Sequence, residues 1–211
     1  PELPTYTTYY QLDPKKRYDF QLNVLDSYII ENIKILPHQG MLKWEVENVE
    51  IINTEFYNSN KVFPENNINV SDRSQGRGIS FVSIEVIPYK YYPQYNKLEV
   101  FTDIDINIVE TGENSNSEIT QAKRSRIFDE FYKDIIINFE YSDRPEDYQS
   151  SAILYVVGGN WMDNSYVQEL LNWRHKQGYI VYTYEAQSSN ENTIKNYIQN
   201  AYDTWENPPE I

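Results

Sequence analysis

The chain has 211 residues, of which 40% are hydrophobic and 15% aromatic, which argues against wholesale disorder and suggests one large domain or one domain with part of a second. Its formal net charge of −14 argues against binding to a nucleic-acid backbone, which requires clustered Lys and Arg side chains. The absence of cysteine excludes disulfides, zinc–thiolate sites and a cysteine nucleophile within these residues.

The chain begins at Pro1-Glu2-Leu3-Pro4, without an initiator Met or an apolar signal segment. We therefore expect the natural N-terminus to lie outside these residues. No run of about eighteen apolar residues follows anywhere in the sequence, so no transmembrane segment is predicted.

Residues 1–110 consist of short β-type runs separated by Pro, Asn, Asp and Gly. In Ile79–Val86 and in most of Lys97–Ile108, apolar residues occupy every second position. This alternation is typical of strands with one face packed and the other in water. Many such runs with turns between them predict an antiparallel β-sandwich over 1–110.

Residues 111–150 are predicted to be a connector with one short helix. Its first part, Thr111–Glu118, is polar and rich in Asn and Ser, as loops are. Helical spacing then relates the apolar residues Phe128, Phe131, Tyr132, Ile135 and Ile136. We expect an amphipathic helix over roughly 126–138.

Residues 151–211 have a different pattern. Ala152–Val157 and Tyr179–Tyr184 are apolar or aromatic along most of their length, as in strands buried on both faces. Asp163 or Asn164 can cap a helix after the first strand, and Ser189 or Asn190 can cap a second helix. This βαβα order predicts a parallel sheet whose third strand should start near Ile211, so the region is expected to be an incomplete part of a larger α/β domain.

Three stretches of this last region, Ala152–Val157, Leu170–Tyr179 and Thr193–Tyr202, contain phrases in a characteristic order. The second stretch ends in Trp-Arg-x-x-x-Gly, and the third contains Ile-Lys-x-Tyr-Ile-Gln. In this order they resemble the opening of the catalytic domain of gingipains, a family of cysteine peptidases, in which a Lys is usual at the place of Arg174.

Earlier phrases resemble the prodomain of the same family. They are Leu3-Pro4, Arg77-Gly78, Pro88-Tyr89, Tyr92–Asn96, Leu98–Thr102 and the segment Phe128–Tyr132 with Ile136–Phe139. The resemblance therefore covers nearly the whole chain, and it rests on the order and spacing of the phrases.

The resemblance implies a zymogen of mixed fold, in which an antiparallel β-sandwich prodomain precedes a βαβα piece of a parallel, caspase-like α/β sheet. The β-domain would act as an inhibitory and folding prodomain, and its partner would be the rest of its own catalytic domain. The parent would be a secreted or cell-surface cysteine endopeptidase acting on protein substrates. By resemblance calcium is a candidate ion of the parent enzyme, although the present residues identify no cofactor and no metal site.

The family uses a His–Cys dyad, in which the thiolate attacks the scissile carbonyl and the His transfers protons. This chain has only two histidines, His38 and His175, and no cysteine. We expect both histidines to be structural and the 211 residues alone to be inactive. No catalytic residue is therefore assigned.

The candidate functional residues are Lys123, Arg124 and Arg126, a basic run in an acidic chain. One interpretation is a solvated flank of the following helix. The other is an inhibitory or processing segment that docks on, or is cut by, a peptidase favouring basic residues. Arg144 lies nearer the expected prodomain junction, but Pro145 follows it, which makes this bond a poor substrate.

Two further patterns have a structural and a functional interpretation. Glu99, Asp103 and Asp105 could hold calcium, although a solvated strand face explains them better. Exposed tyrosines could instead stack on sugar rings, with packing around prolines as the favoured interpretation; they are Tyr89, Tyr91, Tyr92 and Tyr95. The alternative function is thus a non-catalytic β-sandwich surface module that binds a protein or a glycan.

Overall fold

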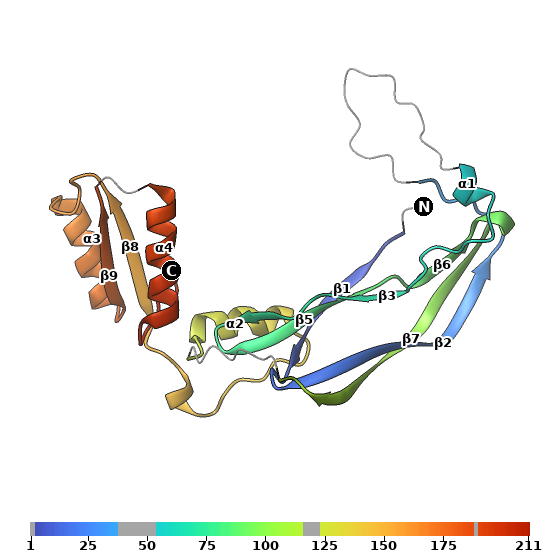
Figure 1. Cartoon of the computed structure of the whole chain (residues 1–211), viewed down its shortest axis with the longest axis horizontal. Helices are drawn as coiled ribbons and strands as arrows, with labels where there is room; N and C mark the ends of the chain where they lie inside the picture. Colours follow the sequence, from blue (N-terminus) through green and yellow to red (C-terminus); the bar gives the residue numbers. More distant parts are fainter. Residues whose placement is uncertain (1–2, 38–53, 116–122, 188–189) are drawn as a thin grey trace, which may run out of the picture. The chain divides into compact units, whose positions relative to one another are not determined.

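The computed structural model describes residues 3–37, 54–115, 123–187 and 190–211 (Figure 1). The chain divides into two units. Unit 1 comprises Pro1–Ser74 and Phe81–Ser115, and unit 2 comprises Gln75–Ser80 and Asn116–Ile211. The division places a short piece of the β-rich region, residues 75–80, in the second unit.

The first sheet has the strand order β1-β5-β3, with β4 paired to β5 outside this path. Its strands are β1 (Tyr6–Leu12), β3 (Ile68–Val70), β4 (Ser74–Gly76) and β5 (Ile79–Val86). Strand β3 pairs antiparallel with β5, so that Ile68 lies opposite Val86. From Val82 onward every second residue of β5 is buried, as the alternation in the sequence predicts.

The second sheet has the order β2-β7-β6 and is antiparallel throughout. Its strands are the long β2 (Lys16–Ile30) and β7 (Lys97–Glu113) and the short β6 (Tyr89–Tyr92). The register runs from Lys16 opposite Glu113 to Ile30 opposite Leu98. Two short helical elements, α1 (Thr54–Tyr57) and η1 (Pro93–Tyr95), complete the described part of unit 1.

Both sheets contribute to one hydrophobic core in unit 1. Its buried centre consists of Leu12 from β1 and Val82, Ile84 and Val86 from β5. Apolar residues of the second sheet pack against this centre, among them Phe20, Leu22, Ile104, Ile106 and Ile108. The mostly antiparallel sheets predicted from the sequence are therefore confirmed, and the apolar faces of the two sheets bury each other.

One of the tyrosines expected to be exposed is not. Tyr91 is fully buried. It lies opposite Leu98 of β7, and it also forms an isolated bridge with Phe63. Its hydroxyl accepts a hydrogen bond of 3.4 Å from the backbone N–H of Ile35. Tyr95, by contrast, is 69% exposed.

Unit 2 contains one amphipathic helix followed by an α/β piece. Its elements are α2 (Arg126–Ile135), η2 (Pro145–Asp147), β8 (Ala152–Gly158), α3 (Ser165–Lys176), β9 (Ile180–Ala186) and α4 (Glu191–Thr204). Helix α2 ends three residues earlier than predicted, because Ile136 is extended and only 3% exposed. The side chains of Asn164 and Asn190 cap α3 and α4 by accepting hydrogen bonds from backbone N–H groups.

Strands β8 and β9 are parallel, and α3 and α4 cover opposite faces of the pair (Figure 1). Arg174 of α3 donates a 3.2 Å hydrogen bond to the hydroxyl of Tyr155. On α4, Tyr197 stacks on Tyr184, with ring centroids 4.0 Å apart. Tyr155 lies opposite Thr183 of β9, and Tyr184 is the next residue of that strand. Because neighbouring residues of a strand point to opposite faces, Tyr155 and Tyr184 lie on the two different faces that α3 and α4 cover.

The segment Glu210–Ile211 lies along the other edge of β8. Glu210 N–H donates to the carbonyl of Ala152, and Leu154 N–H donates to the carbonyl of Ile211, both at 2.9 Å. Ser151, one residue earlier, accepts instead from Ile180 at the start of β9. Because successive carbonyls of a strand point to opposite edges, the segment lies along the edge of β8 that faces away from β9, where the sequence predicts a third strand, although the sheet itself consists of β8 and β9.

No helix within the described ranges is both long enough and apolar enough to cross a membrane.

Candidate functional site

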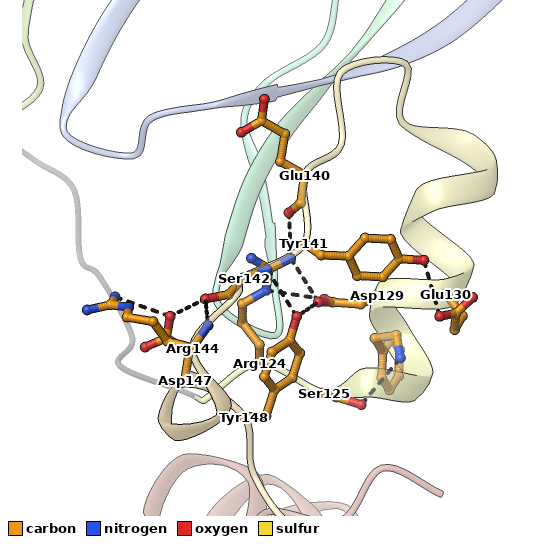
Figure 2. A network of polar contacts seen from close by, with 11 residues as sticks. Arg124, Ser125, Asp129, Glu130, Glu140, Tyr141, Ser142, Arg144, Asp147 and Tyr148 are labelled. Atoms are coloured by element: carbon orange, nitrogen blue, oxygen red, sulfur yellow. Dashed lines mark hydrogen bonds and ion pairs between the residues drawn. The ribbon is translucent and has the colours of Figure 1, made fainter.

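The candidate basic run lies at the start of α2, where the backbone changes from extended to helical (Figure 2). Ser125 is the N-cap residue and is completely buried. Its hydroxyl accepts a 3.3 Å hydrogen bond from Phe128 N–H, which satisfies one of the unpaired donors of the first turn.

The backbone of Arg124 is held by the last residue of η2 and by the chain that follows it. Arg124 N–H donates to the carbonyl of Asp147 at 2.8 Å, and Gln149 N–H donates to the carbonyl of Arg124 at 2.9 Å. These bonds form an isolated parallel bridge between Arg124 and Tyr148. Arg124 is thus held in an extended segment, and Arg126 is the first residue of α2.

The side chain of Arg124 forms a buried ion pair with Asp129, one turn into α2. Two guanidinium nitrogens reach the two carboxylate oxygens, Nη2 to Oδ2 at 2.8 Å and Nε to Oδ1 at 3.3 Å. The side chain of Asp129 is 1% exposed and that of Arg124 is 15% exposed. Such a two-pronged pair fixes both side chains in one geometry.

Further groups surround this pair. The guanidinium of Arg124 also donates to the carbonyl of Glu140 at 2.9 Å and lies 5.2 Å from the ring centroid of Phe139. The Tyr148 hydroxyl donates to Asp129 at 2.7 Å and accepts from the N–H of Ser142 at 3.1 Å. Burial, together with the hydrogen bond to Asp129, raises the pKa of Tyr148, so its hydroxyl keeps its proton.

The loop before η2 has its own polar contacts, drawn to the left of Arg124 in Figure 2. The Ser142 hydroxyl donates to the carboxylate of Asp147, and Arg144 forms an ion pair with the same carboxylate at 3.1 Å. The hydrogen bond from Ser142, with the nearby charge of Arg144, lowers the pKa of Asp147. The side chain of Arg144 remains 72% exposed.

The three sequence-predicted residues therefore lie together but differ in accessibility. Lys123 is 44% exposed, with its ammonium 3.9 Å from Glu206. Arg126 is exposed, with its guanidinium 4.5 Å from the ring centroid of Tyr148. Only Lys123 and Arg126 can reach a partner without first breaking the ion pair of Arg124 with Asp129.

The sequence gives no local sign of Asp129 and Tyr148 as partners of Arg124. Asp129 follows Arg124 by five residues, and Tyr148 is nineteen residues beyond Asp129. Ordinary amphipathic spacing places Asp129 in the first turn of α2, where an acidic residue needs no special explanation. A buried ion pair could be found here only from the three-dimensional structure.

His175 and the acidic candidates form no site among the described residues. His175 is exposed on α3, whereas His38 lies outside the described residues. Asp103 and Asp105 are exposed, and Glu99 accepts hydrogen bonds from Ser27 and Tyr92. Within the described ranges, no group of three or more His, Asp or Glu side chains could hold a metal ion.

Comparison with known families identifies the region of residues 1–145. The family model Propeptide_C25 matches residues 1–145, which is more than half of the sequence. The chain belongs to the Propeptide_C25 family. The resemblance to gingipain prodomains inferred from the sequence is thereby confirmed.

Curated relatives of this Propeptide_C25 chain come from Porphyromonas gingivalis. Gingipain R2 of strain W83 is 23% identical over 167 residues, which is 75% of this chain and 22% of the relative. Gingipain R1 is 21% identical over 166 residues, which is 76% of this chain and 16% of the relative. The chain thus spans about a fifth of the length of these relatives.

A solved structure has a similar fold. The complex of the pro- and mature domains of RgpB from Porphyromonas gingivalis aligns with a TM-score of 0.50 and 22% identity. The alignment covers 65% of this chain and 72% of the solved one. At this identity the likeness concerns the fold alone.

Proposed function

We propose that the chain is the front part of a cysteine endopeptidase precursor that acts outside the cell or on its surface. Residues 1–145 would be the inhibitory and folding propeptide, and residues 151–211 would begin the caspase-like α/β catalytic domain. The observation that carries the proposal is the Propeptide_C25 match over 1–145, directly followed by a parallel βαβα piece.

Within this propeptide, Lys123 and Arg126 would provide the cations that reach the peptidase, while Arg124 would position them. The exposure of the first two side chains and the burial of the Arg124–Asp129 pair support this division of roles. An inhibitory segment must keep its shape when it enters a cleft, since a segment ordered only on binding loses affinity. The fixed backbone of Arg124 satisfies this requirement.

The test uses the full-length precursor that contains this chain, with Lys123→Ala and Arg126→Ala combined. Loss of two charge-assisted contacts should weaken inhibition by roughly tenfold or more and speed maturation. The measurements are cleavage of a peptide with a basic residue before the scissile bond and the time course of precursor processing. Lys133→Ala, an exposed lysine on the same helix, is the matched control. Unchanged inhibition and unchanged processing in the double variant would remove the basic run from the mechanism.

A second candidate function rests on an open cleft of unit 1. The cleft has a volume of about 550 Å³ and is lined by Glu31, Asn32, Tyr92, Tyr95 and Lys97. Its combination of aromatic rings and polar groups suits a glycan or a peptide. Binding to a glycan array that is lost in Tyr95→Ala would favour the surface-module function, and an array without any bound glycan would speak against a glycan ligand.

A further inference from the structure

The turn between β4 and β5 consists of Arg77 and Gly78, and both have positive φ angles, +44° and +82°. Two-residue hairpin turns with this signature favour Asn-Gly, because a Cβ in the left-handed region meets the following carbonyl. An arginine at such a position is therefore strained. A residue held in this conformation calls for a compensating contact of its side chain.

Arg77 has such contacts, all within unit 2. Although hairpin turns normally lie in solvent, Arg77 is only 6% exposed. Its guanidinium donates to the side-chain oxygen of Gln149 at 3.3 Å and to the carbonyl of Pro208 at 3.4 Å, and it also donates to the carbonyl of Pro209. Gln149 in turn donates to the carbonyl of Pro208 at 2.8 Å.

Two aromatic rings complete the surroundings of this guanidinium. It lies 5.1 Å from the ring centroid of Phe128 on α2 and 4.9 Å from that of Tyr202 on α4. Gly76, the residue before Arg77, also lies close to α2, since a Cβ at Gly76 would lie 2.5 Å from the hydroxyl oxygen of Tyr132. The hairpin tip therefore fits closely between the two helices, and a larger residue at position 76 would push it away.

The contacts of Arg77 explain how the chain after α4 is held. Pro208 and Pro209 have no N–H to donate, so their carbonyls are the backbone groups that can fix this bend. Arg77 binds both carbonyls directly before Glu210 and Ile211, which pair with β8. The guanidinium thus holds the bend that leads into the third strand position.

We infer that the Arg77 hairpin tip is a docking element by which the propeptide strands hold the start of the α/β fold, residues 149–211. The partner is a proline-rich bend of the same chain, recognised through the carbonyls of Pro208 and Pro209, while the rings of Phe128 and Tyr202 pack against the guanidinium. This inference rests on the proposed function for its biological meaning, since it would keep the propeptide attached once the connection is cut. The contacts themselves do not require the chain to be a peptidase precursor.

The test cuts the folded full chain at a site-specific protease sequence inserted within residues 116–122, after which the two pieces are tested for dissociation. In the wild type we expect them to remain associated. Arg77→Asn should weaken the association by roughly ten- to a hundredfold, because it removes the charge-assisted contacts. Asparagine is chosen because Asn-Gly suits the turn, so any loss must come from the side-chain contacts.

Arg73→Asn is the matched control. Arg73 also donates to two backbone carbonyls, those of Asp13 and Lys16, but these lie in unit 1. We expect it to leave the association unchanged. Pieces of the wild type that separate at once, or an Arg77→Asn protein that holds them as tightly, would overturn the inference.

Hydrogen exchange of the uncut chain provides a second measurement. Arg77→Asn should speed exchange at Glu210 and Leu154, whose amides join the bend to β8, and leave the centre of β5 unchanged. Faster exchange spread evenly over both units would contradict a local docking role. Neither measurement uses peptidase activity, so a propeptide that fails to inhibit could still pass both, and the two proposals can fail separately.

Discussion

Two guanidinium groups of unit 2 are largely buried, and their surroundings differ. Arg124 faces a carboxylate, whereas Arg77 faces neutral carbonyls and rings. Arginine tolerates both because its planar, weakly hydrated group can donate in its plane and stack on its faces. The carboxylate partner should dominate the stability of the site, because removing one member of a buried pair leaves a buried charge without compensation.

Asp129→Asn tests this expectation at the residue scale. Asparagine keeps the shape of the side chain but removes the charge that faces Arg124, so the chain should lose about 3 kcal/mol of unfolding free energy. Urea unfolding of the full chain, followed by circular dichroism, measures the change. Asp134→Asn, exposed on the same helix, should change the stability by no more than about 0.5 kcal/mol. Equal effects of the two substitutions would show that the ion pair does not stabilise the fold.

At the scale of elements, local patterns predicted what depends on local physics. The alternation of apolar and polar residues predicted the strands β5 and β7, and the run of apolar residues predicted β8. The cap candidates included the correct residues, Asn164 and Asn190. These features are predictable because each arises from neighbours in the sequence.

The elements that the sequence did not predict depend on distant contacts. The end of α2 at Ile135 depends on Ile136, which is buried in an extended conformation. The Arg77-Gly78 turn lacks the Asn-Gly pair that marks two-residue hairpin turns, so the local sequence did not predict a turn there, and Arg77-Gly78 was noted only as a phrase of the family resemblance. The same holds for the site, where Lys123, Arg124 and Arg126 stood out as a run of charge, but the partners of Arg124 did not.

For the whole molecule, the two units should differ in local stability because they differ in how well their sheets are covered. In β5 burial alternates regularly from Val82 onward, whereas β8 is buried only at its first two residues, and no residue of β9 is fully buried. On the helices that cover this sheet, the side chain of Trp173 in α3 is 50% exposed and that of Ile198 in α4 is 43% exposed. A parallel sheet covered this thinly opens more easily than a sheet that shares a core with another.

Amide hydrogen exchange of the isolated chain measures this difference directly. We expect amides in the centre of β5 to exchange at least about tenfold more slowly than those in the second half of β8, because the former open only when the shared core opens. Lengthening the chain with the sequence that would follow it in the proposed precursor should slow exchange in β8 and leave β5 unchanged. Protection in β8 that already equals that of β5 in the isolated chain would contradict this, and would mean that α3, α4 and the Arg77 contact are together sufficient to stabilise the α/β piece.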